Sequence, residues 1–252
     1  MKFTRTLPFL AVLAFLPASS NAALLAHYSF DSGFTDASGN NNDLTIAVGT
    51  PTISTTAGEH VFGGGALDLD STISNEEYLN LTSTITFGTG DAWSISFWGR
   101  RRPGSDDRQG MVAGNPGNTQ DFIWLSNNPS QVEGLRFRST SNQNANFDGF
   151  PDDGQFHHWV VISDGAGTIS AYRDNVPQTA GSAAGDFNII SIGDSYTGTT
   201  HSMNGQIDEM YIFDEAIDST TVSSLFTSNV IPEPGSLILL GLGGLTVLRR
   251  RR

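Results

Sequence analysis

One stretch, residues 156–177, constrains the fold more than any other part of this 252-residue chain. Its first part, Phe156–Ser163, is rich in aromatic and β-branched residues, which suit a pleated and half-buried surface. Asp164–Gly167 then supplies the positive φ angles that a hairpin turn requires. After the turn, Ile169 and Ala171 fall on one face and their polar neighbours on the other. A hairpin with one apolar face must cover that face with a second layer, so this stretch predicts a β-sandwich.

The same alternation recurs along the chain, between turns rich in Gly, Asn, Ser and Asp. Within Asp91–Arg100, Trp93 and Phe97 face one way, whereas Ser94 and Trp98 face the other. The other predicted strands are Leu24–Asp31, Leu44–Val48, Ala66–Leu69, Tyr78–Leu81, Gly110–Ala113, Asp121–Ser126, Gly134–Ser139, Phe187–Ile192 and Gly205–Asp214. Roughly twelve short strands at regular spacing predict an all-β fold, a sandwich or barrel.

Two segments fall outside this strand pattern. Thr140–Asp153 is polar and predicts a long loop. Asp218 is a suitable helix N-cap, and the residues after it predict a short C-terminal helix whose apolar stripe is Val222, Leu225 and Phe226.

The N-terminal end of the chain differs from the middle. Met1–Ala22 begins with Lys2 and Arg5, continues with an apolar stretch and ends in small residues, which is the pattern of a secretory signal peptide. We therefore predict a signal peptide at 1–22, one β-domain at 23–229 and a separate tail at 230–252.

The middle part is strongly acidic. The chain has 13 basic and 26 acidic residues; Lys2, Arg5 and Arg249–Arg252 lie in the two ends, but only one acid, Glu233, does. The β-domain therefore carries 7 − 25 = −18, against −13 for the whole chain. Such a surface repels nucleic acids and anionic lipids, so we expect no nucleic-acid partner. The chain has no cysteine, which excludes disulfides and a cysteine-based zinc site.

Four groups of segments carry a family resemblance: His27–Asp31 with Ser38–Asp43, Gly65–Asp70, Trp93–Trp98, and the central hairpin with Gly205–Asp214. In this order and spacing they resemble a laminin-G-like, concanavalin A-type jelly-roll domain of bacterial secreted proteins. The resemblance implies a sandwich of two antiparallel sheets. The chain departs from the family at Phe156–Trp159, where Trp-His-His-Val is usual, and at Asp174 and Asn175, where Asp-Gly is usual. Because asparagine tolerates the left-handed conformation, we expect that turn to survive.

The tail has three parts in order. Pro232, Glu233, Pro234 and Gly235 form an extended and protease-accessible break. An apolar helix within Val230–Leu248 and four final arginines on its cytoplasmic side follow. This order resembles the PEP-CTERM sorting signal of Gram-negative bacteria, a segment also described as an ice-binding protein C-terminal domain. The resemblance implies an exosortase-type processing enzyme as partner and a transmembrane helix before processing; a plain C-terminal membrane anchor is the alternative.

Catalysis by a retaining glycosidase would need two carboxylates on one face of a strand. Asp208 and Glu209 are adjacent in the last strand, so alternation predicts opposite faces, with Asp208 on the side of Met210. His157 and His158 split between faces in the same way. We therefore expect no enzymatic activity; a divergent polysaccharide-active enzyme, a glycosidase or a lyase, is the alternative.

Calcium is the cofactor that the sequence favours. Asp31, Asn40, Asn42 and Asp208 offer the oxygen ligands that hard cations prefer. The family resemblance implies that the first and last strands, which carry these residues at their ends, lie side by side. The alternative is an Asn/Gly/Asp turn held by its own side-chain hydrogen bonds.

A carbohydrate-binding face is the second site hypothesis, because sugars stack on aromatic rings and form hydrogen bonds with arginine. The candidates on the outer side of a sheet are Trp98, Trp124, Arg136, Arg138 and Tyr211. The alternative is coverage of these residues by loops and ordinary surface packing.

Together these observations predict an exported, non-catalytic binding or matrix protein of the cell envelope or extracellular matrix. We expect it to contact extracellular polysaccharide and to be anchored transiently in the inner membrane by its C-terminal helix. A purely structural surface protein is a further alternative.

Overall fold

The computed structural model describes residues 23–72, 75–103, 108–114, 120–128, 132–148, 153–179, 181–194 and 201–231. The predicted signal peptide and the tail from Pro232 onward, with its sorting motif and apolar helix, lie outside the described residues. Within the described part, no helix is long and apolar enough to cross a membrane.

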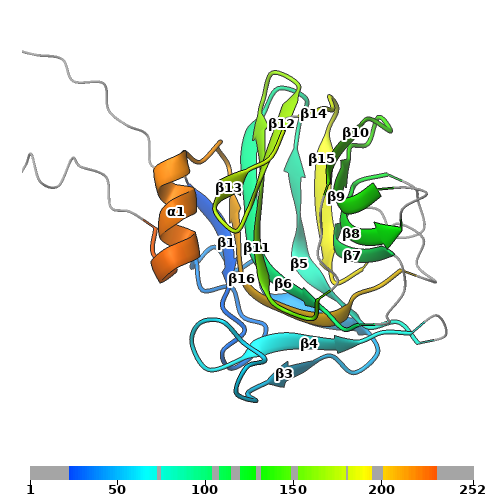
Figure 1. The fold of residues 1–252 in the computed structure, drawn as a ribbon, viewed down its shortest axis with the longest axis vertical. Coiled ribbons are helices and arrows are strands. Elements are labelled where there is room, and N and C mark those ends of the chain that lie inside the picture. Colours follow the sequence, from blue (N-terminus) through cyan, green and yellow to red (C-terminus); the bar gives the residue numbers. More distant parts are fainter. Residues whose placement is uncertain are drawn as a thin grey trace, which may run out of the picture. The chain divides into compact units, whose positions relative to one another are not determined.

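The domain is a sandwich of two antiparallel sheets, as predicted (Figure 1). Sheet A consists of β1 (Leu24–Tyr28), β3 (Thr52–Ser54), β4 (Ala66–Asp70), β6 (Ala92–Arg101), β11 (His157–Asp164), β12 (Thr168–Arg173), β13 (Val176–Pro177), β14 (Gly181–Ser182) and β16 (Asn204–Phe213). Their order is β13-β12-β11-β6-β16-β4-β3, and β1 pairs with β16 while β14 pairs with β12.

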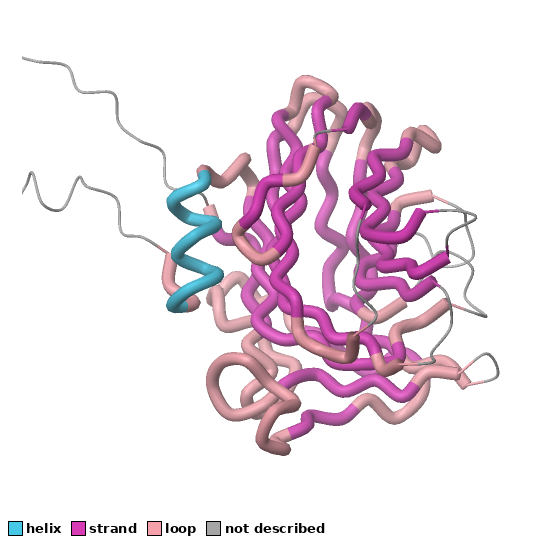
Figure 2. The backbone as a smooth tube through the Cα atoms, viewed as in Figure 1, coloured by secondary structure: helices cyan, strands magenta, loops and turns pink. Residues whose placement is uncertain are grey.

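The second layer, sheet B, has seven strands. They are β2 (Leu44–Val48), β5 (Tyr78–Phe87), β7 (Arg108–Ala113), β8 (Phe122–Asn128), β9 (Val132–Arg138), β10 (Asn144–Asp148) and β15 (Phe187–Ile192). Their order is β10-β9-β8-β7-β15-β5-β2. Figure 2 shows that strands dominate the described chain and that its single helix, α1 (Ser219–Ser228), stands beside them.

The predicted hairpin is central, because β11 pairs with both β12 and β6. Its turn contains Gly165 at φ 72° and Gly167 at φ 95°. Gly165 is required for a second reason, since a Cβ atom there would lie 2.6 Å from the carbonyl oxygen of Gly90. After β12, Asp174 and Asn175 both adopt positive φ, at 50° and 64°, so the turn keeps its left-handed geometry without glycine.

The main core lies between the two sheets and follows the predicted alternation. Trp93 is the centre of an aromatic group, with ring centroids 5.5 Å from Phe87, 5.3 Å from Phe137 and 5.1 Å from Phe187. These four rings come from both sheets, so they join the layers at the end of the sandwich where the central hairpin turns.

The prediction of a continuous loop over Thr140–Asp153 is wrong. Strand β10 lies within it and pairs with β9 along its whole length. Only two apolar residues, Ala145 and Phe147, mark this strand in the sequence, and both are buried in the core. Two alternating apolar positions are enough because β9 supplies the hydrogen-bonding edge.

Helix α1 begins as predicted. The side chain of Asp218 accepts a hydrogen bond from the backbone N–H of Thr221, 2.8 Å away, which is the usual N-cap contact. The helix ends at Asn229, which has φ 54°. Val222 and Leu225 are buried against the outer side of sheet A.

Candidate functional site

Strand β16 contains a β-bulge at its middle. Asp208 pairs with Trp98, but the next paired residue, Tyr211, lies opposite Ser96. Two residues of β16 therefore share one position of β6, and the first of them, Glu209, has φ 48°.

Because of the bulge, the carboxylates of Asp208 and Glu209 do not lie on opposite faces as predicted. Met210 packs in the core between the sheets, whereas Asp208 lies opposite Trp98 on the outer side of sheet A. Glu209 reaches the same outer side, because its Oε2 atom lies 2.8 Å from Nε2 of His27 and accepts a hydrogen bond from the Tyr211 hydroxyl. The expectation of opposite faces is wrong because counting by alternation cannot register an extra residue.

This outer side of sheet A is called the covered face, defined by His27, Trp98, His158, Asp208, Glu209 and Tyr211. Helix α1 lies over it (Figure 1), and a second apolar cluster joins the helix to β11 and β16. The Trp98 ring stacks on Phe226 of α1, with centroids 5.5 Å apart, and meets Phe62 edge-on at 6.0 Å. The hydroxyl of Tyr211 donates to the side chain of Asn229 at 3.0 Å.

Asp208 connects the covered face to the loop that precedes β4. Its Oδ2 atom accepts hydrogen bonds from the backbone N–H groups of Val61, at 2.7 Å, and Phe62, at 3.2 Å. The side chain is fully buried. Burial, reinforced by the neighbouring Glu209 carboxylate, raises the pKa of Asp208 to about 7 despite the two N–H donors.

The two histidines of β11 have different surroundings. His158 is buried on the covered face, where its Nε2 atom lies 2.8 Å from the Ser96 hydroxyl, and burial lowers its pKa to about 4. His157 lies 2.7 Å from Asp174 and 3.3 Å from Asp153, and the hydrogen bond with Asp174 raises its pKa. Hydrogen bonds to neighbouring side chains therefore account for the positions of both imidazole rings.

The four residues predicted to bind calcium form two pairs, and each pair has its own hydrogen-bond partners. Asp31 accepts from the backbone N–H of Gly64, so Asp31 and Asp208 hold successive parts of one loop. Asn40 and Asn42 instead donate their side-chain amides to the carbonyl oxygens of Leu24 and Leu25. Among the residues that the structure describes, no group of three or more His, Cys, Asp or Glu side chains could hold a metal ion.

Three of the residues predicted to bind carbohydrate lie together on the outer side of sheet B. The register pairs Trp124 with Arg136, and Phe122 with Arg138, across β8 and β9. The guanidinium of Arg136 lies 5.0 Å from the centre of the Trp124 ring, and that of Arg138 lies 5.2 Å from the Phe122 ring. The other two candidates, Trp98 and Tyr211, lie on the opposite side of the sandwich, beneath α1.

This surface extends to both neighbouring strands. Arg108 of β7 lies 5.5 Å from the Trp124 ring on its other flank. On β10, Asn146 accepts from Nε of Arg136 at 2.9 Å, and Asn144 accepts from Nε of Arg138 at 2.6 Å. The arginine face is defined here as Arg108, Phe122, Trp124, Arg136, Arg138, Asn144 and Asn146. Both aromatic rings are buried beneath partly exposed guanidinium groups, so the surface that it offers is polar.

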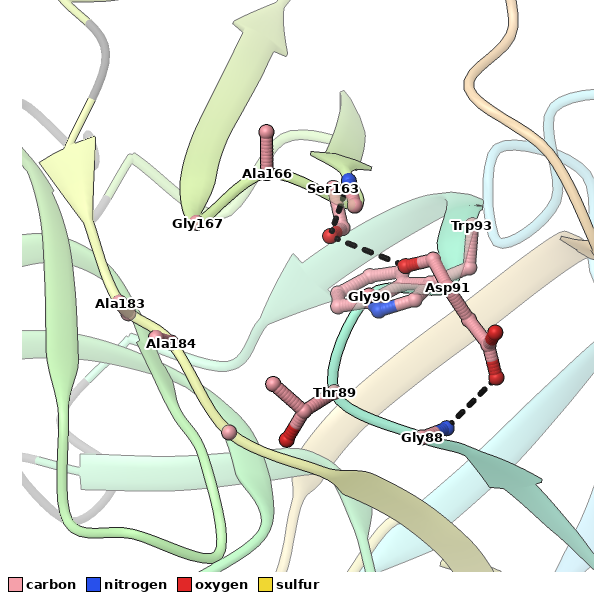
Figure 3. Close-up of a pocket in the computed structure, with 12 residues that line it drawn as sticks. Gly88, Thr89, Gly90, Asp91, Trp93, Ser163, Ala166, Gly167, Ala183 and Ala184 are labelled. Carbon is pink, nitrogen blue, oxygen red and sulfur yellow. Dashed lines mark hydrogen bonds between the residues drawn. The ribbon is translucent and has the colours of Figure 1, made fainter.

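A pocket of about 190 Å³ opens at the end of the sandwich near the central hairpin (Figure 3). Three turns or loops form it: Gly88–Asp91 after β5, the Ser163–Gly167 hairpin turn, and Ala183–Gly185 before β15. Eight of its twelve lining residues are glycine or alanine, and the only aromatic one is Trp93. Sequence reasoning missed this pocket because its three segments are far apart in the chain; clustered glycines were their only common signal.

Comparison with known families agrees with this architecture. The profile described as Concanavalin A-like lectin/glucanases superfamily matches residues 74–223, which is more than half of the chain. The chain belongs to this superfamily. A PEP-CTERM protein-sorting motif matches residues 230–252 and so contains Pro232, Glu233, Pro234 and Gly235. Comparison with curated proteins gives no significant match.

Several solved structures have a fold similar to that of this chain. Domain 4 of AbnA, a GH43 extracellular arabinanase from Geobacillus stearothermophilus in complex with arabinotriose, has a TM-score of 0.61 at 20% identity, and the match covers 82% of this chain and 100% of that one. The binding domain of Paraclostridial Mosquitocidal Protein 1 has a TM-score of 0.61 at 16% identity over 82% of this chain and 52% of that one. A structure of botulinum neurotoxin type C, whose cell entry depends upon interaction with two ganglioside molecules, has a TM-score of 0.57 at 15% identity over 82% and 51%. This chain spans about half the length of the last two chains.

Proposed function

We propose that this protein is an exported, non-catalytic carbohydrate-binding protein of the cell envelope, and that the arginine face is its contact with polysaccharide. The observation that carries the proposal is the distribution of positive charge. The β-domain has only seven basic residues, and three of them, Arg108, Arg136 and Arg138, share this face. Guanidinium groups donate hydrogen bonds to hydroxyls and pair in a bidentate manner with carboxylates, so they suit neutral and acidic sugars.

The similar structures support the class of ligand at the level of the fold. One of them is a domain of an arabinanase in complex with arabinotriose, and another belongs to a toxin whose cell entry depends upon ganglioside molecules. Both associate this architecture with glycans.

The sorting motif at residues 230–252 supports export and attachment to the envelope. We infer that an exosortase-type enzyme cuts the tail close to Pro232–Gly235 and leaves the β-domain as the mature protein. Mass spectrometry of the native protein should find a C-terminus near this motif; an intact C-terminal arginine cluster would favour a plain anchor.

The main test removes the two guanidinium groups at the centre of the arginine face. The double variant Arg136→Gln/Arg138→Gln should bind its polysaccharide at least tenfold more weakly, since each lost charged hydrogen bond is worth about 1.5–3 kcal/mol. Binding is measured by affinity electrophoresis through gels that contain alginate, an acidic polymer, or arabinan, a neutral one. The matched control is Arg100→Gln/Arg173→Gln on β6 and β12 of the other sheet, which removes the same number of positive charges. Equal mobility of the double variant and the wild type would refute the arginine face as the site.

Two alternatives make different predictions in the same experiments. The adjacent carboxylates Asp208 and Glu209 are buried beneath α1 and the loop before β4, which supports a role without catalysis. Release of reducing ends from a polysaccharide by the purified protein would instead favour a divergent enzyme. Unretarded migration of the wild type in every gel would favour a purely structural surface protein.

A further inference from the structure

The pocket at the end of the sandwich is lined by one hydrogen-bond donor that the described part of the protein does not use. Trp93 lines the pocket and is only 3% exposed, with its ring held in the aromatic core. Among the described residues its indole nitrogen has no hydrogen-bond partner, and Figure 3 draws none for it. An indole N–H with no partner at the bottom of a pocket is a donor available to a ligand.

The polar side chains around the pocket are, by contrast, already occupied. The Asp91 carboxylate accepts from the backbone N–H of Gly88 at 2.7 Å. The Ser163 hydroxyl donates to the carbonyl of Asp91 at 3.4 Å and accepts from the N–H of Gly165 at 3.3 Å. Thr89 donates its hydroxyl to Asp186 at 2.7 Å. These bonds fix the walls of the pocket, so its shape is formed before any ligand arrives.

The walls are built to leave room. The exposed side chains of Ala166 and Ala184 project little from their turns, and a Cβ atom added to Gly167 would have the Cβ of Ala184 as its nearest neighbour, at 3.9 Å. Small residues of this kind bring backbone N–H and C=O groups to the pocket surface.

The charge at the rim limits the kind of ligand. Asp91 lines the pocket, Asp164 lies in the hairpin turn and Asp186 follows its last lining residue, whereas no basic residue lines it. An anionic ligand would be repelled by these carboxylates. A neutral ring with hydroxyl groups around its edge suits a pocket that offers one unused N–H donor between small glycine- and alanine-rich walls.

We propose that this pocket binds one neutral sugar ring, such as the terminal residue of a glycan, as a second site separate from the arginine face. One oxygen of the sugar ring accepts the indole N–H of Trp93, and its other hydroxyls meet the backbone N–H and C=O groups of the glycine- and alanine-rich turns. This inference uses none of the residues of the arginine face, so the two proposals can fail independently.

The test uses the intact domain and small probes. Methyl glycosides of glucose, galactose, mannose and arabinose are titrated at millimolar concentration, and binding is followed by tryptophan fluorescence and saturation-transfer NMR. We expect at least one glycoside to bind saturably and to change the emission. The other three tryptophans, Trp98, Trp124 and Trp159, are at most 9% exposed and do not line the pocket, so Trp93 is the expected reporter.

Two variants probe the site. Ala184→Leu fills the pocket from an exposed position and should abolish the binding. The control Ala47→Leu, at an exposed position of β2 that does not line the pocket, should leave the binding unchanged. Trp93→Phe keeps an aromatic ring in the core but removes the N–H donor, and should weaken binding about tenfold. Melting temperatures identify a variant that has lost its fold.

Three outcomes would overturn the proposal: saturable binding of none of the glycosides, equal binding by Ala184→Leu and the wild type, or equal binding by Trp93→Phe and the wild type. Arg136→Gln/Arg138→Gln should retain full glycoside binding. A failure of the arginine face in the polysaccharide gels therefore leaves this result standing, and the reverse is also true.

Discussion

The two outer faces of the sandwich cover their aromatic residues in different ways. Each sheet carries aromatic residues on its outer side, Trp98 and Tyr211 on sheet A and Phe122 and Trp124 on sheet B. The covered face hides its rings beneath a helix and a loop of the same chain, whereas the arginine face covers its rings with long cationic side chains. A helical cover excludes a ligand, whereas a guanidinium cover leaves hydrogen-bond donors at the surface. The location of the aromatic residues alone therefore does not predict a binding site.

The largest expected effect tests whether α1 is part of the fold. Leu225 is buried between the helix and sheet A, and Leu225→Ala should lower the free energy of unfolding by about 2–5 kcal/mol. In urea titrations the exposed neighbour Thr227→Ala should cost far less. A loss below about 0.5 kcal/mol would mean that the helix is not required to close the covered face.

The next largest effect concerns the charge of Asp208 on the covered face. A carboxyl whose pKa is raised on folding binds its proton more tightly in the folded state. Asp208 should therefore lower stability as the pH rises from about 4, its unfolded pKa, to about 7, its folded pKa, with a constant cost above that range. Asp208→Asn keeps an acceptor for Val61 and Phe62 and removes the charge, so it should gain on the order of 2 kcal/mol relative to the wild type at pH 8.

Urea titrations at pH 4, 6 and 8 would measure this difference. Asp70→Asn, at an exposed position, should leave the pH profile of the wild type unchanged. Parallel profiles for Asp208→Asn and the wild type would contradict the raised pKa and with it the dry environment of the covered face.

The smallest expected effect concerns calcium. The side-chain amides of Asn40 and Asn42 donate to the carbonyl oxygens of Leu24 and Leu25. The carboxylates of Asp31 and Asp208 accept from backbone N–H groups of the loop before β4, so hydrogen bonds already account for these four side chains. We expect equal melting temperatures in the presence of chelator and of excess Ca²⁺. A rise of several degrees with Ca²⁺ would instead restore the cation site that the sequence predicts.

Local pattern predicted most of the architecture, because one buried face per sheet imposes a period of two. The strands Leu44–Val48, Thr168–Arg173 and Phe187–Ile192 lie where alternation places them, and Asp218 begins the helix. The bulge at Glu209 escaped because an inserted residue leaves no compositional mark.

The site was harder to predict than the fold. Trp124, Arg136 and Arg138 come together because β8 and β9 are adjacent, and the sequence does suggest that pairing. Trp98 and Tyr211 are separated from them because α1 returns over sheet A, and the pocket around Trp93 needs three turns that only the tertiary fold unites.

The pairing of β1 with β16 has a consequence for how the protein is tethered. Ala23 is joined to Asp214 by two hydrogen bonds, and both Leu24 and Ile231 pack against the apolar cluster under α1. The domain therefore begins and ends on one side of the sandwich, and the arginine face belongs to the sheet on the other side. Any group joined to the C-terminal end of the domain would therefore start from the side of the sandwich opposite to the proposed arginine-face site.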